Sequence, residues 1–246
     1  MIFYSFKYWL NPKNRHDRKI KKQFYREIAK MGYGRKYRRY QISCKTFAPT
    51  DTAVIPVIIK YLDLFEREGV KLQFINALGV KGFYDASEYL IGEYKKNMPP
   101  NYNYPMLNEV SQTLARICDL RYVDEYIAFL SDNVSFEAGY LVEMLGNMRV
   151  EKAVPTIIKL LDCVAIIPQK WHENTLEELK FYVSQCAIKA LGKLKDSSLI
   201  SYLEKFLEPE KLDWIKFDCA DNNKYLKRIY REYKELATKA IAKLKK

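Results

Sequence analysis

The chain has little of what metal and catalytic sites usually need. Its 246 residues include only two histidines, His16 and His172. His172 and the glutamate after it resemble the start of an H-E-x-x-H zinc motif, but Leu176 stands where the second histidine would be. Residues 218–223 resemble a calcium loop without its required glycine and glutamate. We therefore expect no metal ion and no cofactor.

Cysteine pairs and long apolar runs are also missing. The five cysteines are scattered, and none forms the C-x-x-C pair of a zinc ribbon or a thioredoxin-like site. Isolated thiols in odd number are typical of a reducing compartment. No apolar run approaches the ~20 residues that span a bilayer. Lys7 interrupts the short aromatic N-terminus, and no small-residue cleavage site follows it. These features predict a cytoplasmic protein.

Sequence motifs of the common enzyme classes are absent as well. The chain contains no G-x-x-x-x-G-K-[ST], no G-x-G-x-x-G and no G-x-S-x-G. No nucleophile is paired in sequence with a base. The sequence thus favours a non-catalytic protein, names no catalytic residue, and leaves catalysis open.

Positive charge is concentrated at the N-terminus. The net charge is +12, and residues 1–45 hold 14 of the 42 Lys and Arg but only two of the 30 Asp and Glu. The rest of the chain is neutral. A basic arm before a neutral body predicts an acidic partner, such as nucleic acid, anionic lipid or an acidic protein face.

Tyrosines alternate with basic residues within this arm, a pattern that can suit single-stranded nucleic acid. An alternative is a solvated basic linker whose tyrosines pack on the following domain. The candidate polyanion-binding residues are Arg35, Lys36, Tyr37, Arg38, Arg39 and Tyr40.

A capping helix is expected within the arm. Pro12 is a good helix start and Gly32 a good stop. The apolar residues between them predict that one helix face packs on the domain that follows; they are Ile20, Phe24, Ile28 and Met31. We expect an arm and capping helix over 1–50 and a repeat domain over 51–246.

From about residue 51 onward, apolar residues recur at helical spacing. In the helix expected over 174–194, Val183, Ala187 and Leu191 share one face, and the helix expected over 226–244 repeats the pattern. The alternation of apolar and polar residues that is typical of a strand is weak and limited to residues 37–47. The fold class is therefore predicted to be all-α.

The chain also repeats itself. VIPVIIKYLD (54–63) matches AVPTIIKLLD (153–162), and each places a proline near a helix start. Helices expected upstream of such segments end in NALG, QTLA, EMLG and KALG, and the chain finishes with KAIAKL. Small residues at intervals predict close helix approach, namely Ala77, Ala115, Gly139, Ala187 and Ala190.

KALGKLKDSSLISYLEKFL and EMLGNMRVEKAVPTIIKLL resemble the HEAT-repeat signature, and the resemblance extends over about four-fifths of the chain. It implies a right-handed α-solenoid of about five helix pairs, as in short, often bacterial, HEAT-repeat proteins. Second helices of such repeats usually line a concave face. The residues expected to face solvent there are Asn76, Gln112, Arg116, Glu143, Asn147, Gln185, Lys189 and Lys193.

The mixed polarity of these residues suits a protein surface better than a phosphate backbone. The leading hypothesis is a scaffold or adaptor that binds a protein partner. The alternative is a nucleic-acid-binding protein that uses the basic arm, with or without chemistry resembling alkylation repair.

Overall fold

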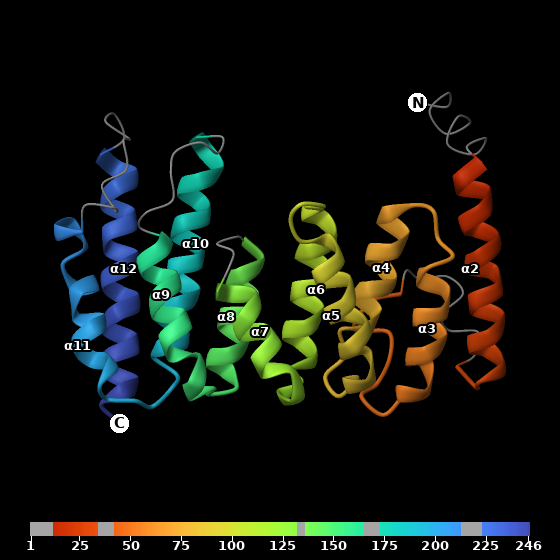
Figure 1. The fold of residues 1–246 in the computed structure, drawn as a ribbon, viewed down its shortest axis with the longest axis horizontal. Coiled ribbons are helices and arrows are strands. Elements are labelled where there is room, and N and C mark those ends of the chain that lie inside the picture. The colour runs from red at the N-terminus through yellow and green to blue at the C-terminus, as the bar shows by residue number, and fades with distance from the viewer. Residues whose placement is uncertain (1–11, 34–41, 132–135, 165–172, 213–222) are drawn as a thin grey trace. The chain divides into compact units, whose positions relative to one another are not determined.

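The computed structural model describes residues 12–33, 42–131, 136–164, 173–212 and 223–246, and this part of the chain forms α-helices and short 3-10 helices without any β-strand (Figure 1). The all-α prediction is confirmed for these residues. The chain divides into two compact units, an N-terminal unit of residues 1–119 and a C-terminal unit of residues 120–246. No helix found in the described ranges is both long and apolar enough to cross a membrane.

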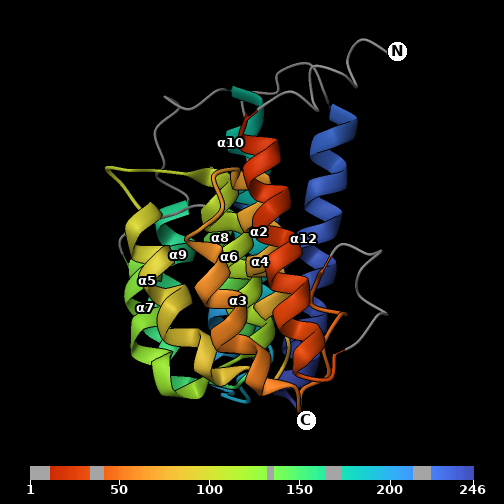
Figure 2. The ribbon, with the colours of Figure 1, turned by 90° about the vertical axis from the view of Figure 1, so that its right-hand side faces the viewer.

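Antiparallel helix pairs build the N-terminal unit, with an extra helix before them. The extra helix α2 packs against α3, α3 pairs with α4, α5 pairs with α6, and α4 packs against α6 (Figures 1 and 2). One turn of 3-10 helix leads into α3 and another into α5. The α-helices are α2 (Pro12–Lys30), α3 (Ile55–Leu62), α4 (Glu68–Leu78), α5 (Ser87–Asn97) and α6 (Tyr104–Ile117).

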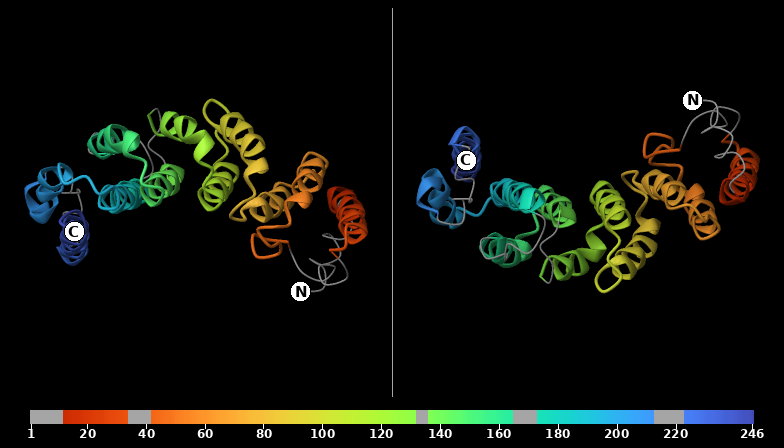
Figure 3. Two further views of the ribbon diagram at one scale, coloured as in Figure 1. Left: turned by 90° about the horizontal axis from the view of Figure 1, so that it is seen from below. Right: turned by 90° about the horizontal axis from the view of Figure 1, so that it is seen from above.

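Three helix pairs build the C-terminal unit: α7 with α8, α9 with α10, and α11 with α12. Within this unit α8 and α10 lie side by side, with α7 and α9 forming a second layer (Figure 3). The second helices α10 and α12 also pack together. The bounds are α7 (Val123–Ser131), α8 (Phe136–Asn147), α9 (Val154–Val164), α10 (Glu173–Leu191), α11 (Leu199–Glu204) and α12 (Asn223–Leu244).

Helix starts follow the local sequence. Pro56 and Pro155 are each the second residue of their helices, α3 and α9, where a missing N–H leaves no hydrogen bond unmade. The Asn103 side chain accepts a hydrogen bond of 3.2 Å from the Met106 amide and caps the start of α6. Such local signals explain why the helix positions were predictable.

The core consists of the residues that the helical spacing predicts. The leucine at the end of each described second helix is fully buried, and Ile241 of α12 is 7% exposed. These leucines are Leu78, Leu114, Leu145 and Leu191. The inner stripe of second helices is confirmed.

The capping helix is largely as expected. Ile20, Phe24 and Ile28 of α2 are buried, and the Phe24 ring centroid lies 4.7 Å from that of Phe74 on α4. The helix ends at Lys30, and Gly32 adopts a left-handed φ of 90°. Met31 is 37% exposed, so its place in the buried stripe was predicted wrongly. It follows the last helical residue, and the turn carries it off the apolar face.

Second helices approach each other closely in the C-terminal unit. A Cβ added to Gly146 would lie 2.5 Å from Ala190 Cα, and one added to Gly192 would lie 2.6 Å from Ala240 Cβ. A Cβ on Gly139 would overlap the Tyr182 ring. The close approach expected at Gly139 and Ala190 is therefore confirmed. These glycines let α8, α10 and α12 pack at short range.

A residue with positive φ follows the second helix at four places. In each case a leucine and a small residue stand at or near the end of the helix, and the residue three positions after that small residue has a positive φ. The small residues are Gly79, Ala115, Gly146 and Gly192. The residues with positive φ are Gly82 (98°), Cys118 (56°), Arg149 (56°) and Lys195 (58°). Left-handed backbone at a helix end satisfies carbonyl groups that the helix leaves unpaired.

Candidate functional site

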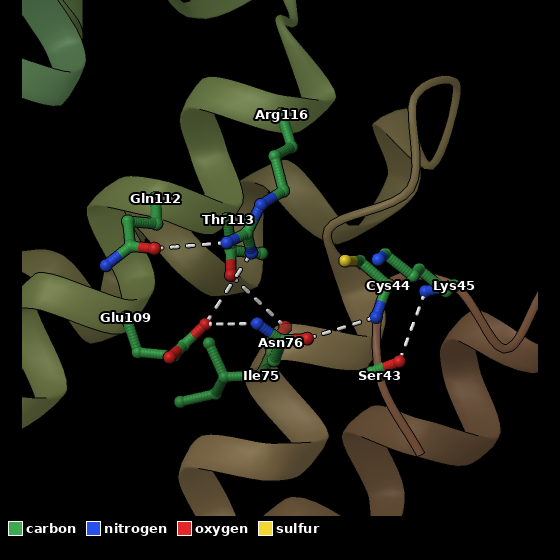
Figure 4. A network of polar contacts seen from close by, with 9 residues as sticks. All are labelled: Ser43, Cys44, Lys45, Ile75, Asn76, Glu109, Gln112, Thr113 and Arg116. Atoms are coloured by element: carbon green, nitrogen blue, oxygen red, sulfur yellow. Dashed lines mark hydrogen bonds and ion pairs between the residues drawn. The ribbon is translucent and has the colours of Figure 1, made fainter.

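Two of the expected concave-face residues, Asn76 and Gln112, belong to one polar network in the N-terminal unit (Figure 4). Asn76 of α4 donates a 2.7 Å hydrogen bond to Glu109 Oε1 of α6. Its side-chain oxygen Oδ1 accepts a 3.0 Å hydrogen bond from the backbone amide of Cys44. Asn76 therefore joins α4, α6 and the segment before α3.

Arg116 completes this network. Its guanidinium donates a 3.0 Å hydrogen bond to Gln112 Oε1 and lies 3.6 Å from Glu109 Oε1. Gly79 leaves room for it, because a Cβ there would lie 3.2 Å from Arg116 Cδ. The structure thus brings Asn76, Gln112 and Arg116 together, and all three are partly buried. Sequence analysis missed Glu109, although it lies seven residues before Arg116 on the same helix face.

The C-terminal unit has a comparable set of polar contacts. Lys193 donates a 2.5 Å hydrogen bond to Asn147 Oδ1, and its ammonium lies 3.9 Å from Glu143 Oε1. Gln185 of α10 donates a 3.1 Å hydrogen bond to Glu232 of α12. These contacts join α8, α10 and α12 and carry both charge signs.

Lys189 lies beside the buried thiol of Cys186. Burial, with a smaller effect of the Glu143 carboxylate, raises the pKa of Cys186 to about 11, and Lys189 opposes this only weakly. Burial likewise raises the pKa of the Cys118 thiol. Both thiols are therefore protonated at neutral pH, and neither is an activated nucleophile.

A small cavity of about 260 Å³ lies among the helices of the N-terminal unit. Its lining includes Glu66, Glu68 and Glu93 together with Lys71 and Lys96, so both charge signs meet there. No group of three or more histidine, cysteine or carboxylate side chains suited to a metal ion occurs in the described residues. The mixed lining gives the cavity no clear preference for an anion or a cation.

The expected polyanion-binding residues of the arm lie outside the described residues. These are Arg35, Lys36, Tyr37, Arg38, Arg39 and Tyr40. His16 is exposed, and its Nε2 lies 2.9 Å from the Leu64 carbonyl oxygen.

A basic stripe on α2 was missed. Arg15, Lys19, Lys22 and Arg26 are all exposed, and their spacing places them on one helix face opposite buried Phe24. No hydrogen bond or ion pair joins these four side chains to another described residue. Their spacing of four, three and four residues was a readable signal, since it is the period of a helix face. We call these four residues the α2 basic stripe.

No match to this chain was found among protein-family models, curated proteins or solved structures. Function must therefore be argued from the residues of this chain alone.

Proposed function

We propose that this protein is a non-catalytic scaffold of HEAT-like repeats, a right-handed solenoid of about five helix pairs, that binds a protein partner through its second helices. The pairing of helices, the packing of second helices on one another and the recurrent left-handed turn support a repeat architecture. Each is a feature that one repeated unit would place at regular intervals along a chain.

One observation carries the functional part: partly exposed polar side chains of the second helices have both charge signs and are held by hydrogen bonds and ion pairs. In the N-terminal unit Glu109 and Arg116 form a pair, and in the C-terminal unit Glu143 and Lys193 do. Side chains held in place before binding lose less conformational entropy when a partner docks. A phosphate backbone would be repelled by the carboxylates, whereas a protein surface can match both signs.

The proposal is tested by charge reversal on second helices. We expect the double variant R116E/K189E to lose the protein partners that the natural chain captures from a native lysate. Both positions are partly exposed, and neither side chain belongs to the apolar core. Captured proteins are identified by mass spectrometry at two salt concentrations.

The matched control reverses one charge of the same sign in each unit, but on first helices. Lys95 of α5 and Lys159 of α9 are exposed, so K95E/K159E changes the net charge equally. Partners lost only from the second-helix variant support the proposal. Partners retained by both variants, or lost equally from both, contradict it.

A second candidate function, nucleic-acid binding, is favoured by the α2 basic stripe. Its four cations extend over about 16 Å at the rise of an α-helix and face away from the buried side of α2. They belong to the basic arm, and further basic residues follow them in the sequence at positions 35, 36, 38 and 39. Such a segment fits a strand of phosphates.

This candidate is tested by filter binding of a single-stranded oligonucleotide over a range of salt concentrations. We expect K19Q/K22Q to weaken binding and to reduce the log–log salt slope by about 0.7 per lost phosphate contact. The control K81Q/K95Q removes two exposed lysines elsewhere in the same unit and should bind as the natural chain does. Equal losses in both variants would indicate an unspecific effect of net charge.

A further inference from the structure

A cavity of about 470 Å³ lies at the C-terminal ends of α8, α10 and α12, wholly within the C-terminal unit. Gly146 and Gly192 form part of its lining, beside the helix contacts that those glycines allow. None of the described residues that line it is acidic or aromatic. Its remaining lining residues are Asn147, Arg149, Lys193, Lys195, Lys243 and Lys246.

Four of the five cations at this cavity form no ion pair with a described residue. Lys193 is paired with Asn147 and Glu143. No hydrogen bond or ion pair joins the side chains of the other four to any part of the chain that the structure describes. A helix C-terminus attracts a nearby cation, which accounts for single lysines at helix ends. It does not account for five like charges around one cavity, because they repel one another.

Two of these cations also have an uncommon backbone conformation. Arg149 and Lys195 hold left-handed φ values of 56° and 58°, a conformation that side-chain-bearing residues rarely adopt. Both residues line the cavity, so two of its cations stand at positions where glycine would be less strained. In the N-terminal unit the uncharged Cys118 holds the same conformation, with a φ of 56°.

We propose that this cavity binds a compact oligophosphate anion, such as inorganic triphosphate or the triphosphate of a nucleotide. A single phosphate carries about two negative charges at neutral pH, so two or three linked phosphates are needed to match four or five cations. Without an aromatic lining residue, the cavity offers no platform on which a base could stack. The cavity therefore recognises the phosphates of its ligand and not a base. The site shares Asn147 and Lys193 with the proposed partner-binding surface, but its binding of an oligophosphate does not require a partner protein.

The test is isothermal titration calorimetry of the full chain with inorganic triphosphate, with a parallel thermal melt. We expect R149G/K195G to bind triphosphate about a hundredfold more weakly, because each lost charge-assisted contact costs about tenfold. Glycine adopts a positive φ without steric cost, so this variant should melt at or above the melting temperature of the natural chain. A loss of binding without a loss of stability would separate a ligand role from a structural one.

The control variant is K227Q/K234Q, which removes two exposed lysines from α12 at a distance from the cavity. It should bind triphosphate as the natural chain does. Orthophosphate should bind far more weakly than triphosphate, since it carries fewer charges. Equal binding of ATP and triphosphate would identify a nucleotide as one source of the phosphates, and binding of triphosphate alone would identify a free oligophosphate.

Three results would overturn the proposal: no binding of triphosphate, an equal loss in K227Q/K234Q, or unchanged binding in R149G/K195G. A fourth is binding of a single-stranded oligonucleotide at this site without any binding of triphosphate, which would assign the cations to a nucleic-acid backbone. Because no partner protein is present in the titration, failure here leaves the scaffold proposal standing, and failure of the scaffold proposal leaves this site standing.

Discussion

Both units have residues with left-handed φ shortly after their second helices, but the side chains at these positions differ. The N-terminal unit has Gly82 and Cys118 at that position, and the C-terminal unit has Arg149 and Lys195. The cavities differ in the same sense, since carboxylates and lysines share the N-terminal one whereas cations alone provide the charge of the C-terminal one. The two units thus share left-handed residues after their second helices but differ in the charge that they place there.

The largest expected effect tests whether the two units are also separate in stability. Leu191→Ala should cost ~2–5 kcal/mol, because this leucine is fully buried and its truncation leaves a cavity. Hydrogen exchange should show lost protection over residues 181–208 and unchanged protection in α4. Leu78→Ala should reverse the pattern. Loss of protection throughout the chain in either variant would show that the units unfold as one.

The next effect concerns helix approach. Gly146→Ala should cost ~1–3 kcal/mol by overpacking, because its Cβ would lie 2.5 Å from the backbone Cα of Ala190. Gly79→Ala should cost less, since its new Cβ would lie 3.1 Å from the Asn76 carbonyl oxygen and 3.2 Å from the flexible Arg116 side chain, both longer than the contact at position 146. Gly92→Ala is the control, with no atom within 4 Å, and should gain ~0.5–1 kcal/mol in α5. Thermal melts of the three variants check this order, which an equal cost at positions 79 and 146 would contradict.

A smaller effect is expected from the left-handed turn. Cys118→Gly should stabilise the N-terminal unit by ~0.5 kcal/mol, because relief of the left-handed strain slightly exceeds the added entropy of the unfolded chain. Cys118→Ala keeps the strain and serves as the control. Denaturant midpoints measure both variants, and a gain in the alanine variant alone would assign the effect to the side chain and not to the backbone.

The smallest effect is the pH dependence of the contact between α2 and α3. Glu27 accepts hydrogen bonds from Lys60 at 2.8 Å and Tyr61 at 2.9 Å, and these contacts lower the pKa of its carboxyl below 4.5. Stability from Glu27 is therefore present above pH 4.5 and is lost as the pH falls through the lowered value. At an exposed pair such as this one it amounts to ~0.5 kcal/mol.

Tyr61 responds at the other end of the pH range. Burial, and then the hydrogen bond to Glu27, raises the pKa of Tyr61 from 10.0 to about 12. Its contribution is therefore present below pH 10.0 and is lost as the pH rises towards 12. Urea midpoints of the natural chain and of Glu27→Gln, measured at pH 7, at pH 3 and above pH 10, test both the acid and the alkaline loss of stability. An acid loss that is equal in the two proteins would assign it to other carboxylates.

Much of the local structure could be read from the sequence. The prolines placed the starts of α3 and α9, the apolar spacing identified Leu78, Leu114, Leu145 and Leu191 as core, and both signals act within a few residues. Met31 was misplaced because helical spacing alone does not show where a helix ends. Glu109 was missed because its partners Asn76 and Arg116 lie on two different helices.

The sequence by itself determined that this protein is helical, which residues of each helix are buried, and that its charge gathers at the N-terminus. Each of these depends on neighbours along the chain or on simple counting. Only the tertiary structure decided that Arg149, Lys195 and Lys243 surround one cavity, and that Gly146 and Gly192 are contact points between helices. These residues lie at or just past the ends of different helices, and packing alone brings the ends of α8, α10 and α12 close enough for their charges to act together.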